Sequence, residues 1–289
     1  MKVGFIGIGV QKAATSWLHD VLMEHPQAAM SDPKELDFFT RTYDRGYHWY
    51  ERHFDAAPAG ALIAGECSPS YIYDPAAPER VKLYNPDMRL IVILRDPVSR
   101  AFSNHLHEIR TRGIPDTMSF EDGLKINPMY LEQGRYATHM ARWLKVFDRE
   151  ALLVLVAEDI AEDPASALAQ VYAHIGVPEF RPDALHERRH ESVQNRNEGL
   201  QAMLKFGGDR LRGLGLGKAL EQAKKMPGLS HALALNKRDL RREIPKMKPE
   251  TRIELEAYFA DEMRCLPSLI GRDSLPWQTW QATQRKGAA

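Results

Sequence analysis

Residues 2–22 read KVGFIGIGVQKAATSWLHDVL and decide the fold. The first seven form a short apolar run typical of a buried strand, and the apolar residues from Trp17 onward recur at the spacing of one helix face. We expect the loop between them to attract anions, because backbone N–H groups and the positive end of the helix dipole point into it. Lys12 adds a positive charge to this loop, and Thr15 and Ser16 add hydroxyl donors.

Three later apolar runs are bounded by turn residues and rich in branched aliphatic side chains, as buried parallel strands are: ALIAGE (61–66), RLIVILRDP (89–97) and ALLVLVAE (151–158). Asp96 is placed to cap, and Pro97 to start, a helix that runs to about Arg112. Further helices are predicted at 140–147 and 164–175. The alternation predicts a P-loop-like three-layer α/β/α fold with a central parallel sheet.

The 289 residues are predicted to form a single domain in three parts: an α/β core (1–180), a basic helical and loop cover (181–250), and a C-terminal helix and tail that pack on the core (251–289). After about residue 180 the strand patterns stop. The cover contains 16 Lys or Arg against 9 Asp or Glu, which favours a site for an anionic ligand over a solvated helical face. One amphipathic helix at 249–266, and the Trp277 and Trp280 pair, are expected to pack back on the core.

Composition excludes several classes of protein. Lys plus Arg and Asp plus Glu both number 39, and this balance argues against a nucleic-acid binder. The two cysteines, Cys67 and Cys265, lie far apart in the chain and suggest neither a disulfide framework nor a zinc site. The N-terminal apolar run is too short for a signal peptide, and the chain has no 18-residue apolar stretch. We therefore expect a cytoplasmic protein that does not cross a membrane.

The anion loop departs from the nucleotide-triphosphate pattern GxxxxGK[ST]. Gln11 stands where the second Gly belongs, and Ala13 follows Lys12 where Ser or Thr would bind magnesium, so no metal is predicted. Arg95 ends the apolar run before Asp96 and suits a second phosphate, which indicates a ligand with two separate phosphate groups. Ser103, two turns into the next helix, is placed to offer its hydroxyl to that same phosphate.

Two segments carry a family resemblance. FIGIGVQKAATSWL (5–18) resembles the 5′-phosphosulfate-binding segment of sulfotransferases that use 3′-phosphoadenosine 5′-phosphosulfate (PAPS), and VILRDPVSRAFSNHLHEI (92–109) resembles their 3′-phosphate-binding segment. Further stretches follow in the order seen in the carbohydrate-type, Golgi-like branch and its bacterial relatives: KELDFF (34–39), RGYHWYERHF (45–54), GECSPSYIYDP (65–75), GRYATHMARWLKVF (134–147), LLVLVAEDIAEDP (152–164) and LPSLIGRDSLPW (266–277).

The resemblance implies roles for individual residues. The 5′-phosphosulfate would be held by Lys12, the backbone of Ala13 and Ala14, and the hydroxyls of Thr15 and Ser16. Arg95 and Ser103 would bind the 3′-phosphate. Apart from the resemblance, Arg188, Arg189 and Arg196 of the basic cover are candidates to bind a phosphate of the donor. Arg196 is preferred because residues 195–199 read as an exposed loop. Trp17 matches an adenine-stacking aromatic, although a core position on the first helix explains it equally well. Glu35 matches the general base, with His48, His53, His105 and His107 as alternatives.

These roles imply transfer of a sulfuryl group from PAPS to a hydroxyl, or an amine, of a small-molecule or carbohydrate acceptor, leaving adenosine 3′,5′-bisphosphate (PAP). Cys67 and Asp37 stand where the carbohydrate enzymes often have Lys and His, which weighs against a sulfated glycan as the acceptor. The segment 113–133 is polar and rich in turn residues, and is a candidate lid or acceptor flap. A nucleotide-dependent kinase and a non-catalytic nucleotide-binding module are the alternative functions.

Overall fold

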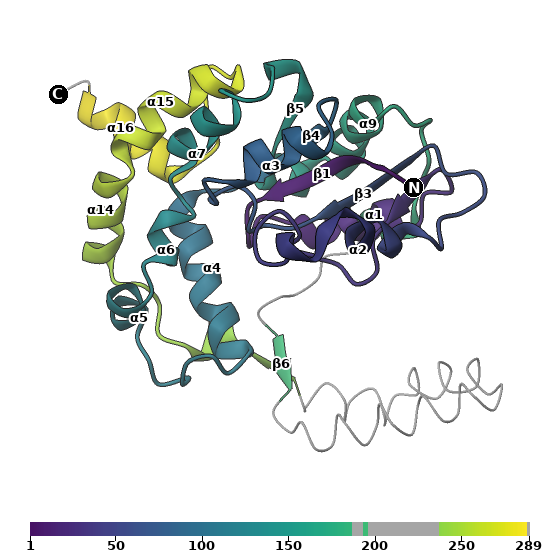
Figure 1. Cartoon of the computed structure of the whole chain (residues 1–289). Coiled ribbons are helices and arrows are strands. Elements are labelled where there is room, and N and C mark those ends of the chain that lie inside the picture. Colours follow the sequence, from purple (N-terminus) through teal and green to yellow (C-terminus); the bar gives the residue numbers. More distant parts are fainter. Residues whose placement is uncertain (187–192, 196–236, 288–289) are drawn as a thin grey trace. The chain divides into compact units, whose positions relative to one another are not determined.

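The structure is a computed structural model of the whole chain, and it describes residues 1–186, 193–195 and 237–287 (Figure 1). The chain divides into two compact units. The first comprises Met1–Asn104, Glu121–Arg189 and Met247–Ala289, and the second comprises His105–Phe120 and His190–Lys246. The predicted single domain, with a core at 1–180 and a cover at 181–250, stays a prediction, because most of the cover lies outside the described residues.

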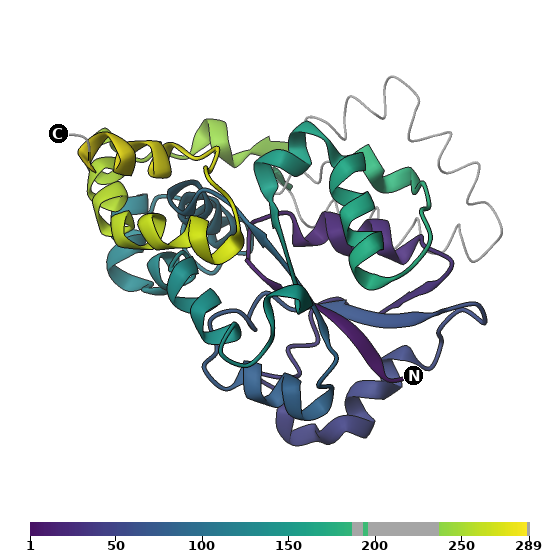
Figure 2. The ribbon, with the colours of Figure 1, turned by 90° about the horizontal axis from the view of Figure 1, so that it is seen from above.

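A five-stranded parallel sheet lies at the centre of the first unit, in the order β2-β3-β1-β4-β5. The strands are β1 (Val3–Gly9), β2 (Ala28–Met30), β3 (Ile63–Cys67), β4 (Arg89–Leu94) and β5 (Leu152–Val156). Helices cover both faces of this sheet (Figure 2). The predicted three-layer α/β/α fold with a central parallel sheet is confirmed, and only the three-residue β2 has no counterpart among the predicted strands.

Two glycines let the central strands pack closely. Gly7 of β1 pairs with Cys67 of β3, and a Cβ on Gly7 would lie 2.6 Å from the Cys67 Sγ. A Cβ on Gly65 would lie 2.2 Å from the ring of Phe5. Any side chain at either glycine would push these neighbours out of a close-packed core.

The helices before residue 180 are α1 (Thr15–Met23), α2 (Gly46–Glu51), α3 (Ala77–Tyr84), α4 (Pro97–Arg110), α5 (Phe120–Ile126), α6 (Met129–Glu132), α7 (Tyr136–Trp143), α8 (Ala157–Glu162) and α9 (Pro164–Ile175). The predicted start of α4 is confirmed, since the Ser99 N–H donates to Asp96 Oδ1 at 2.8 Å. The helix predicted at 140–147 is shifted toward the N-terminus: α7 begins at Tyr136, where its buried face starts, and ends at Trp143. Short 3-10 turns lie at Tyr43–Arg45, Arg52–Phe54, Arg149–Ala151 and Asp183–His186.

The C-terminal part of the first unit consists of α14 (Pro249–Tyr258), α15 (Ala260–Ile270) and α16 (Gln278–Gly287). The single helix predicted at 249–266 is wrong, because the backbone leaves helical geometry at Phe259, whose ring is fully buried. Of the two tail tryptophans, Trp277 is in the core. Trp277 is buried beside Tyr136, and its Nε1 donates to Glu158 Oε2 at 2.9 Å.

The described part of the second unit contains a two-stranded antiparallel sheet of β6 (Val193–Asn195) and β7 (Lys237–Asp239), followed by α13 (Leu240–Glu243). The expectation that strands stop after about residue 180 is therefore wrong. Each of these strands is three residues long and mainly polar, so neither has the apolar run by which a strand is recognised in a sequence.

Candidate active site

The predicted anion loop joins the end of β1 to the start of α1. Lys12 and Ala14 adopt left-handed backbone conformations, with φ values of 71° and 67°, and the Ala13 N–H donates to the Val10 carbonyl at 3.2 Å. The two conformations and this hydrogen bond make a tight turn immediately before α1. Ala14 precedes the first helical residue, Thr15, and has no polar side chain, so the first-turn N–H groups receive no capping acceptor from it.

Lys12 and Arg95, predicted at two different phosphates, lie at the same edge of the sheet. β1 and β4 are neighbouring parallel strands, so the loops at their carboxyl ends meet. Arg95 Nη1 donates to the Lys12 carbonyl at 2.8 Å, and the Tyr136 hydroxyl donates to the Arg95 carbonyl at 2.8 Å. Lys12 is 7% exposed as a residue. The structure thus holds the Arg95 guanidinium against the backbone of the loop that carries Lys12.

The other predicted donor residues lie on the two helices that leave this edge. Thr15, Ser16 and Trp17 form the first turn of α1, and Ser103 is buried within α4. The Trp17 Nε1 donates to the Leu185 carbonyl at 3.1 Å. This bond fixes one edge of the indole. It is compatible both with stacking of Trp17 on adenine and with a core position for Trp17 on α1. Arg188, Arg189 and Arg196 lie outside the described residues.

Glu35 lies beside the anion loop. Lys34 Nζ donates to Ser16 Oγ at 3.0 Å and to Glu35 Oε1 at 2.9 Å, so a single lysine links the first turn of α1 to the predicted base. The Glu35 side chain is 46% exposed. Glu35 and Asp37 both have left-handed backbones, with φ values of 63° and 49°. Such conformations are uncommon outside glycine and gather at functional sites.

Glu66, at the end of β3, was not among the predicted site residues. Its carboxylate is fully buried and accepts hydrogen bonds from the hydroxyls of Ser68 at 2.7 Å, Tyr71 at 2.5 Å and Tyr50 at 3.3 Å. Burial raises the pKa of Glu66 to about 7, although these three hydroxyls favour its charged form. A glutamate that directly follows a buried apolar run and precedes the hydroxyl-rich stretch 68–71 was the available signal.

The two departures from the carbohydrate-type pattern differ in burial: Cys67 lies in the core, and the Asp37 side chain is partly exposed. Cys67 is fully buried, and burial raises the pKa of its thiol to about 12. Asp37 Oδ1 accepts a hydrogen bond from Ser70 Oγ at 2.6 Å. Cys67 therefore packs as a small apolar side chain, and Asp37 has a partner within its own neighbourhood.

The core tyrosines and the histidines named as alternative bases occupy different environments. Tyr50, Tyr71 and Tyr130 are fully buried, so they pack in the core and do not line an open acceptor pocket. His48 is exposed on α2, and the His53 ring Nδ1 lies 3.0 Å from the Trp49 carbonyl oxygen. The other two candidate bases, His105 and His107, belong to the second unit. The proposed flap at 113–133 contains α5 and α6.

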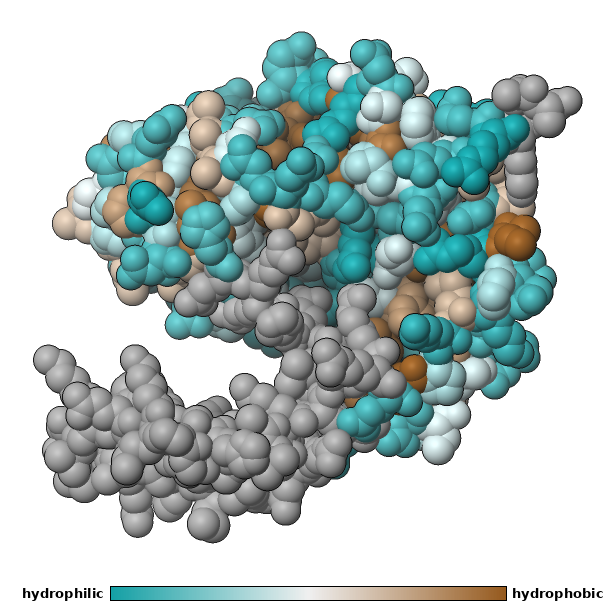
Figure 3. Space-filling view, turned by 180° about the vertical axis from the view of Figure 1, so that it is seen from behind, coloured by the Kyte–Doolittle hydropathy of each residue, from teal (hydrophilic) through white to brown (hydrophobic). Residues whose placement is uncertain are grey.

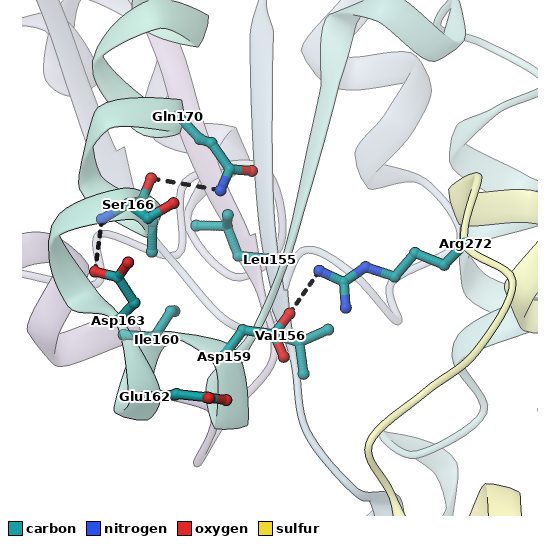
Figure 4. A pocket seen from close by; sticks show the side chains of 10 residues that line it. Leu155, Val156, Asp159, Ile160, Glu162, Asp163, Ser166, Gln170 and Arg272 are labelled. Atoms are coloured by element: carbon teal, nitrogen blue, oxygen red, sulfur yellow. Dashed lines mark hydrogen bonds and ion pairs between the residues drawn. The ribbon is translucent and has the colours of Figure 1, made fainter.

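A cavity of about 250 Å³ lies at the end of β5, between α8 and α9 (Figure 4). Arg272 points toward Asp159 across its mouth, at 2.6 Å, while Asp163 Oδ1 accepts the Ser166 N–H at the start of α9. Its lining includes no described residue of the predicted donor site. Within the ranges described, no group of three or more His, Cys, Asp or Glu side chains is arranged to hold a metal ion.

Hydrophilic side chains dominate the face seen from behind, where apolar side chains occur in scattered positions (Figure 3). Among the described helices, none combines the length and the apolar character needed to span a membrane.

Comparison with known proteins decides the family. The family model described as "Sulfotransferase domain" matches residues 5–202, which include the anion loop, Glu35 and Arg95. The chain belongs to the sulfotransferase domain family. The resemblance expected from the two phosphate-binding segments is therefore confirmed.

This sulfotransferase domain has relatives with carbohydrate substrates in their names. It is 32% identical over 220 residues to the human (Homo sapiens) heparan sulfate glucosamine 3-O-sulfotransferase 6, which covers 73% of this chain and 61% of that protein. It is 27% identical to the mouse (Mus musculus) bifunctional heparan sulfate N-deacetylase/N-sulfotransferase 4, over 96% of this chain and 31% of that protein. The chain thus spans less than two thirds of either relative.

A solved structure matches almost end to end. The sulfotransferase from Alicyclobacillus acidocaldarius superposes with a TM-score of 0.69 at 25% identity, covering 97% of this chain and 99% of that one. The architecture of the described residues is thus that of a sulfotransferase. The cytoplasmic location has no support in these comparisons and stays a prediction.

Proposed function

We propose that this sulfotransferase domain transfers a sulfuryl group from PAPS to a hydroxyl, or an amine, of a carbohydrate acceptor. The observation that carries the proposal is the meeting of three functional groups at one edge of the sheet. Arg95 contacts the backbone of Lys12, and Lys34 joins the adjacent helix turn to Glu35. The cations of Arg95 and Lys34 and the carboxylate of Glu35 thus lie around one anion loop. Transfer of an anionic group to a neutral acceptor requires positive charge and a base placed in this way.

The residues present fit a donor with phosphates at two ends. The 5′ end would be held by Lys12, the N–H groups of Ala13 and Ala14, and the hydroxyls of Thr15 and Ser16. The 3′-phosphate would be held by Arg95 and Ser103, and we assign Trp17 to the adenine ring and Arg196 to a further donor contact. Arg95 uses one N–H on the Lys12 carbonyl, and a guanidinium has four more to offer an anion.

Bound PAPS supplies the activated sulfuryl group and a phosphate leaving group. Lys12 places its ammonium against the negative charge that develops on that leaving group. Removal of one such donor typically costs about 3 kcal/mol of transition-state stabilisation. The low exposure of Lys12 limits its solvation by water, which strengthens its electrostatic effect on the bound group.

Glu35 takes the proton from the acceptor. Lys34 holds its Oε1 at 2.9 Å, so we assign the incoming proton to Oε2. The exposed position of Glu35 is suited to an acceptor that enters from solvent. The names of the two heparan sulfate relatives support a carbohydrate acceptor, whereas the buried Cys67 supports an acceptor contact different from the lysine of the carbohydrate enzymes.

A ligand-binding experiment tests the donor. Thermal unfolding is measured with PAP, ADP and ATP, and we expect PAP to stabilise the protein most, because a ligand that binds only the native state raises its melting temperature. Arg95→Ala should remove the preference for PAP. Arg149→Ala is the matched control, because Arg149 also donates to backbone carbonyls. Arg149 precedes β5 and therefore lies at the amino ends of the strands, away from the anion loop.

A transfer assay tests the reaction. Sulfate from labelled PAPS is followed onto glucosamine-containing oligosaccharides and onto phenols, with and without EDTA. We expect transfer to the oligosaccharides that persists in EDTA. Stabilisation by ATP over PAP, together with phosphate transfer that needs magnesium, would instead establish the kinase alternative.

A further inference from the structure

The hydroxyls around Glu66 also hold the loop that carries Glu35. The Ser68 Oγ accepts the Asp37 N–H at 2.9 Å, and the Tyr71 Oη accepts the Phe38 N–H at 2.9 Å. Each hydroxyl also contacts one oxygen of the Glu66 carboxylate. Two parallel connections therefore run from the loop backbone, through a hydroxyl, to the same buried carboxylate.

The direction of these hydrogen bonds is fixed. A backbone N–H can only donate, so the loop occupies an acceptor position on each hydroxyl. The single proton of each hydroxyl then points to Glu66, whose two oxygens both accept. Burial and the nearby Glu66 charge raise the pKa of Tyr71 well above its usual range, so this phenol keeps the proton that it donates.

We propose that Glu66 is a positioning residue for sulfuryl transfer: through Ser68 and Tyr71 its carboxylate fixes the backbone of residues 37 and 38, and with it the position of Glu35. The proposal rests on the proposed role of Glu35 as the base. The left-handed backbones of Glu35 and Asp37 give the loop a conformation that costs free energy. The bonds that Ser68 and Tyr71 accept from the N–H groups of Asp37 and Phe38 offset that cost. They keep the carboxylate of Glu35 beside Lys34, which also contacts Ser16.

The ionised form of Glu66 is the one that fits. A protonated Glu66 would have to donate a hydrogen bond, and the hydroxyl that received it would no longer have Glu66 as an acceptor. The ionisable groups that face Glu66 are Tyr50 from α2, Tyr71 and Cys67 from the chain around β3, and Asp37 from the loop. With a pKa of about 7 for Glu66, we expect kcat to fall about tenfold from pH 8 to pH 6.

The two tyrosines that donate to Glu66 provide a matched pair of variants. Both are fully buried and both contact Oε1, but only the Tyr71 hydroxyl also accepts a loop N–H. Tyr71→Phe should lower kcat at least tenfold with the KM for PAPS unchanged, and Tyr50→Phe should stay within threefold of wild type. Amide hydrogen exchange of the peptide over residues 35–40 should be at least tenfold faster in Tyr71→Phe only. If Tyr71→Phe does not fold, the kcat and exchange measurements are made on Ser68→Ala, which removes the other connection, from the Asp37 N–H through Ser68 to Glu66.

Two further variants separate the possible failures. Glu66→Gln keeps the shape but cannot accept from both hydroxyls, so the fall in kcat near pH 7 should disappear. Glu35→Gln combined with Tyr71→Phe should be no slower than Glu35→Gln alone. Two results would overturn the positioning role if both Tyr71→Phe and Ser68→Ala gave them. The first is amide exchange at the wild-type rate. The second is a wild-type kcat in spite of faster amide exchange. Absence of sulfuryl transfer in the wild type would instead refute the proposed function, while the exchange measurement still reports whether Glu66 holds the loop.

Discussion

Glu66 should make the stability of this protein depend on pH in a defined direction. The folded protein raises the pKa of this carboxyl from an ordinary 4.5 to about 7, mainly by burial. Between these two values the folded state keeps a proton that the unfolded state has lost, so the free energy of unfolding falls as the pH rises. The stabilisation is fully present below pH 4.5 and is lost by about pH 7. The difference between the two pKa values corresponds to about 3 kcal/mol.

The variant Glu66→Gln isolates this contribution. Glutamine does not titrate, so the free energy of unfolding of wild type minus that of the variant should fall by about 3 kcal/mol between pH 4.5 and pH 7.5. Any hydrogen bond that glutamine fails to make adds an offset that is constant across this range. Urea denaturation followed by tryptophan fluorescence measures both proteins at each pH. Parallel curves for the two proteins, or a difference that grows with pH, would refute the assigned environment of Glu66.

Other substitutions test the anion site and its support. Lys12→Ala should lower kcat about 100-fold, and an equal loss in Lys12→Arg would contradict a purely electrostatic role. Arg95→Ala should raise the KM for PAPS at least tenfold with a smaller change in kcat, whereas Arg149→Ala should leave both unchanged; donor binding like wild type in Arg95→Ala would refute its assignment. Asp96→Ala should destabilise the protein by about 2 kcal/mol in urea denaturation, because Asp96 caps α4 and also accepts the N–H and hydroxyl of Thr279. A change below 0.5 kcal/mol would show that these bonds contribute little.

Much of the fold could be predicted because its strands are local signals. Four of the five parallel strands are apolar runs between turn residues, and the start of α4 follows from Asp96 and Pro97 alone. β2, β6 and β7 are three residues each, too short for any periodicity to appear. The break between α14 and α15 depends on burial of Phe259, which a helical pattern in the sequence does not contain.

The residues of the candidate site also fall into two groups: those that the sequence indicates and those that only the structure reveals. Lys12, Glu35 and Arg95 belong to short motifs, so the sequence suggested them, and the structure added that Lys12 and Arg95 are in contact. Glu66 is buried, and of the hydroxyls that donate to it, those of Ser68 and Tyr71 follow closely in the sequence whereas that of Tyr50 comes from α2. No local pattern reports that the Tyr50 hydroxyl reaches the same carboxylate.

The bond from Thr279 to Asp96 has a consequence for how the protein matures. It joins two residues 183 positions apart, and the earlier one is the immediate neighbour of Arg95. A nascent chain on the ribosome therefore lacks this support for the arginine until residue 279 has emerged. Affinity for the nucleotide should therefore appear late in synthesis, after the sheet has formed. A stalled chain that ends before Thr279 should fold its strands but bind PAP only weakly.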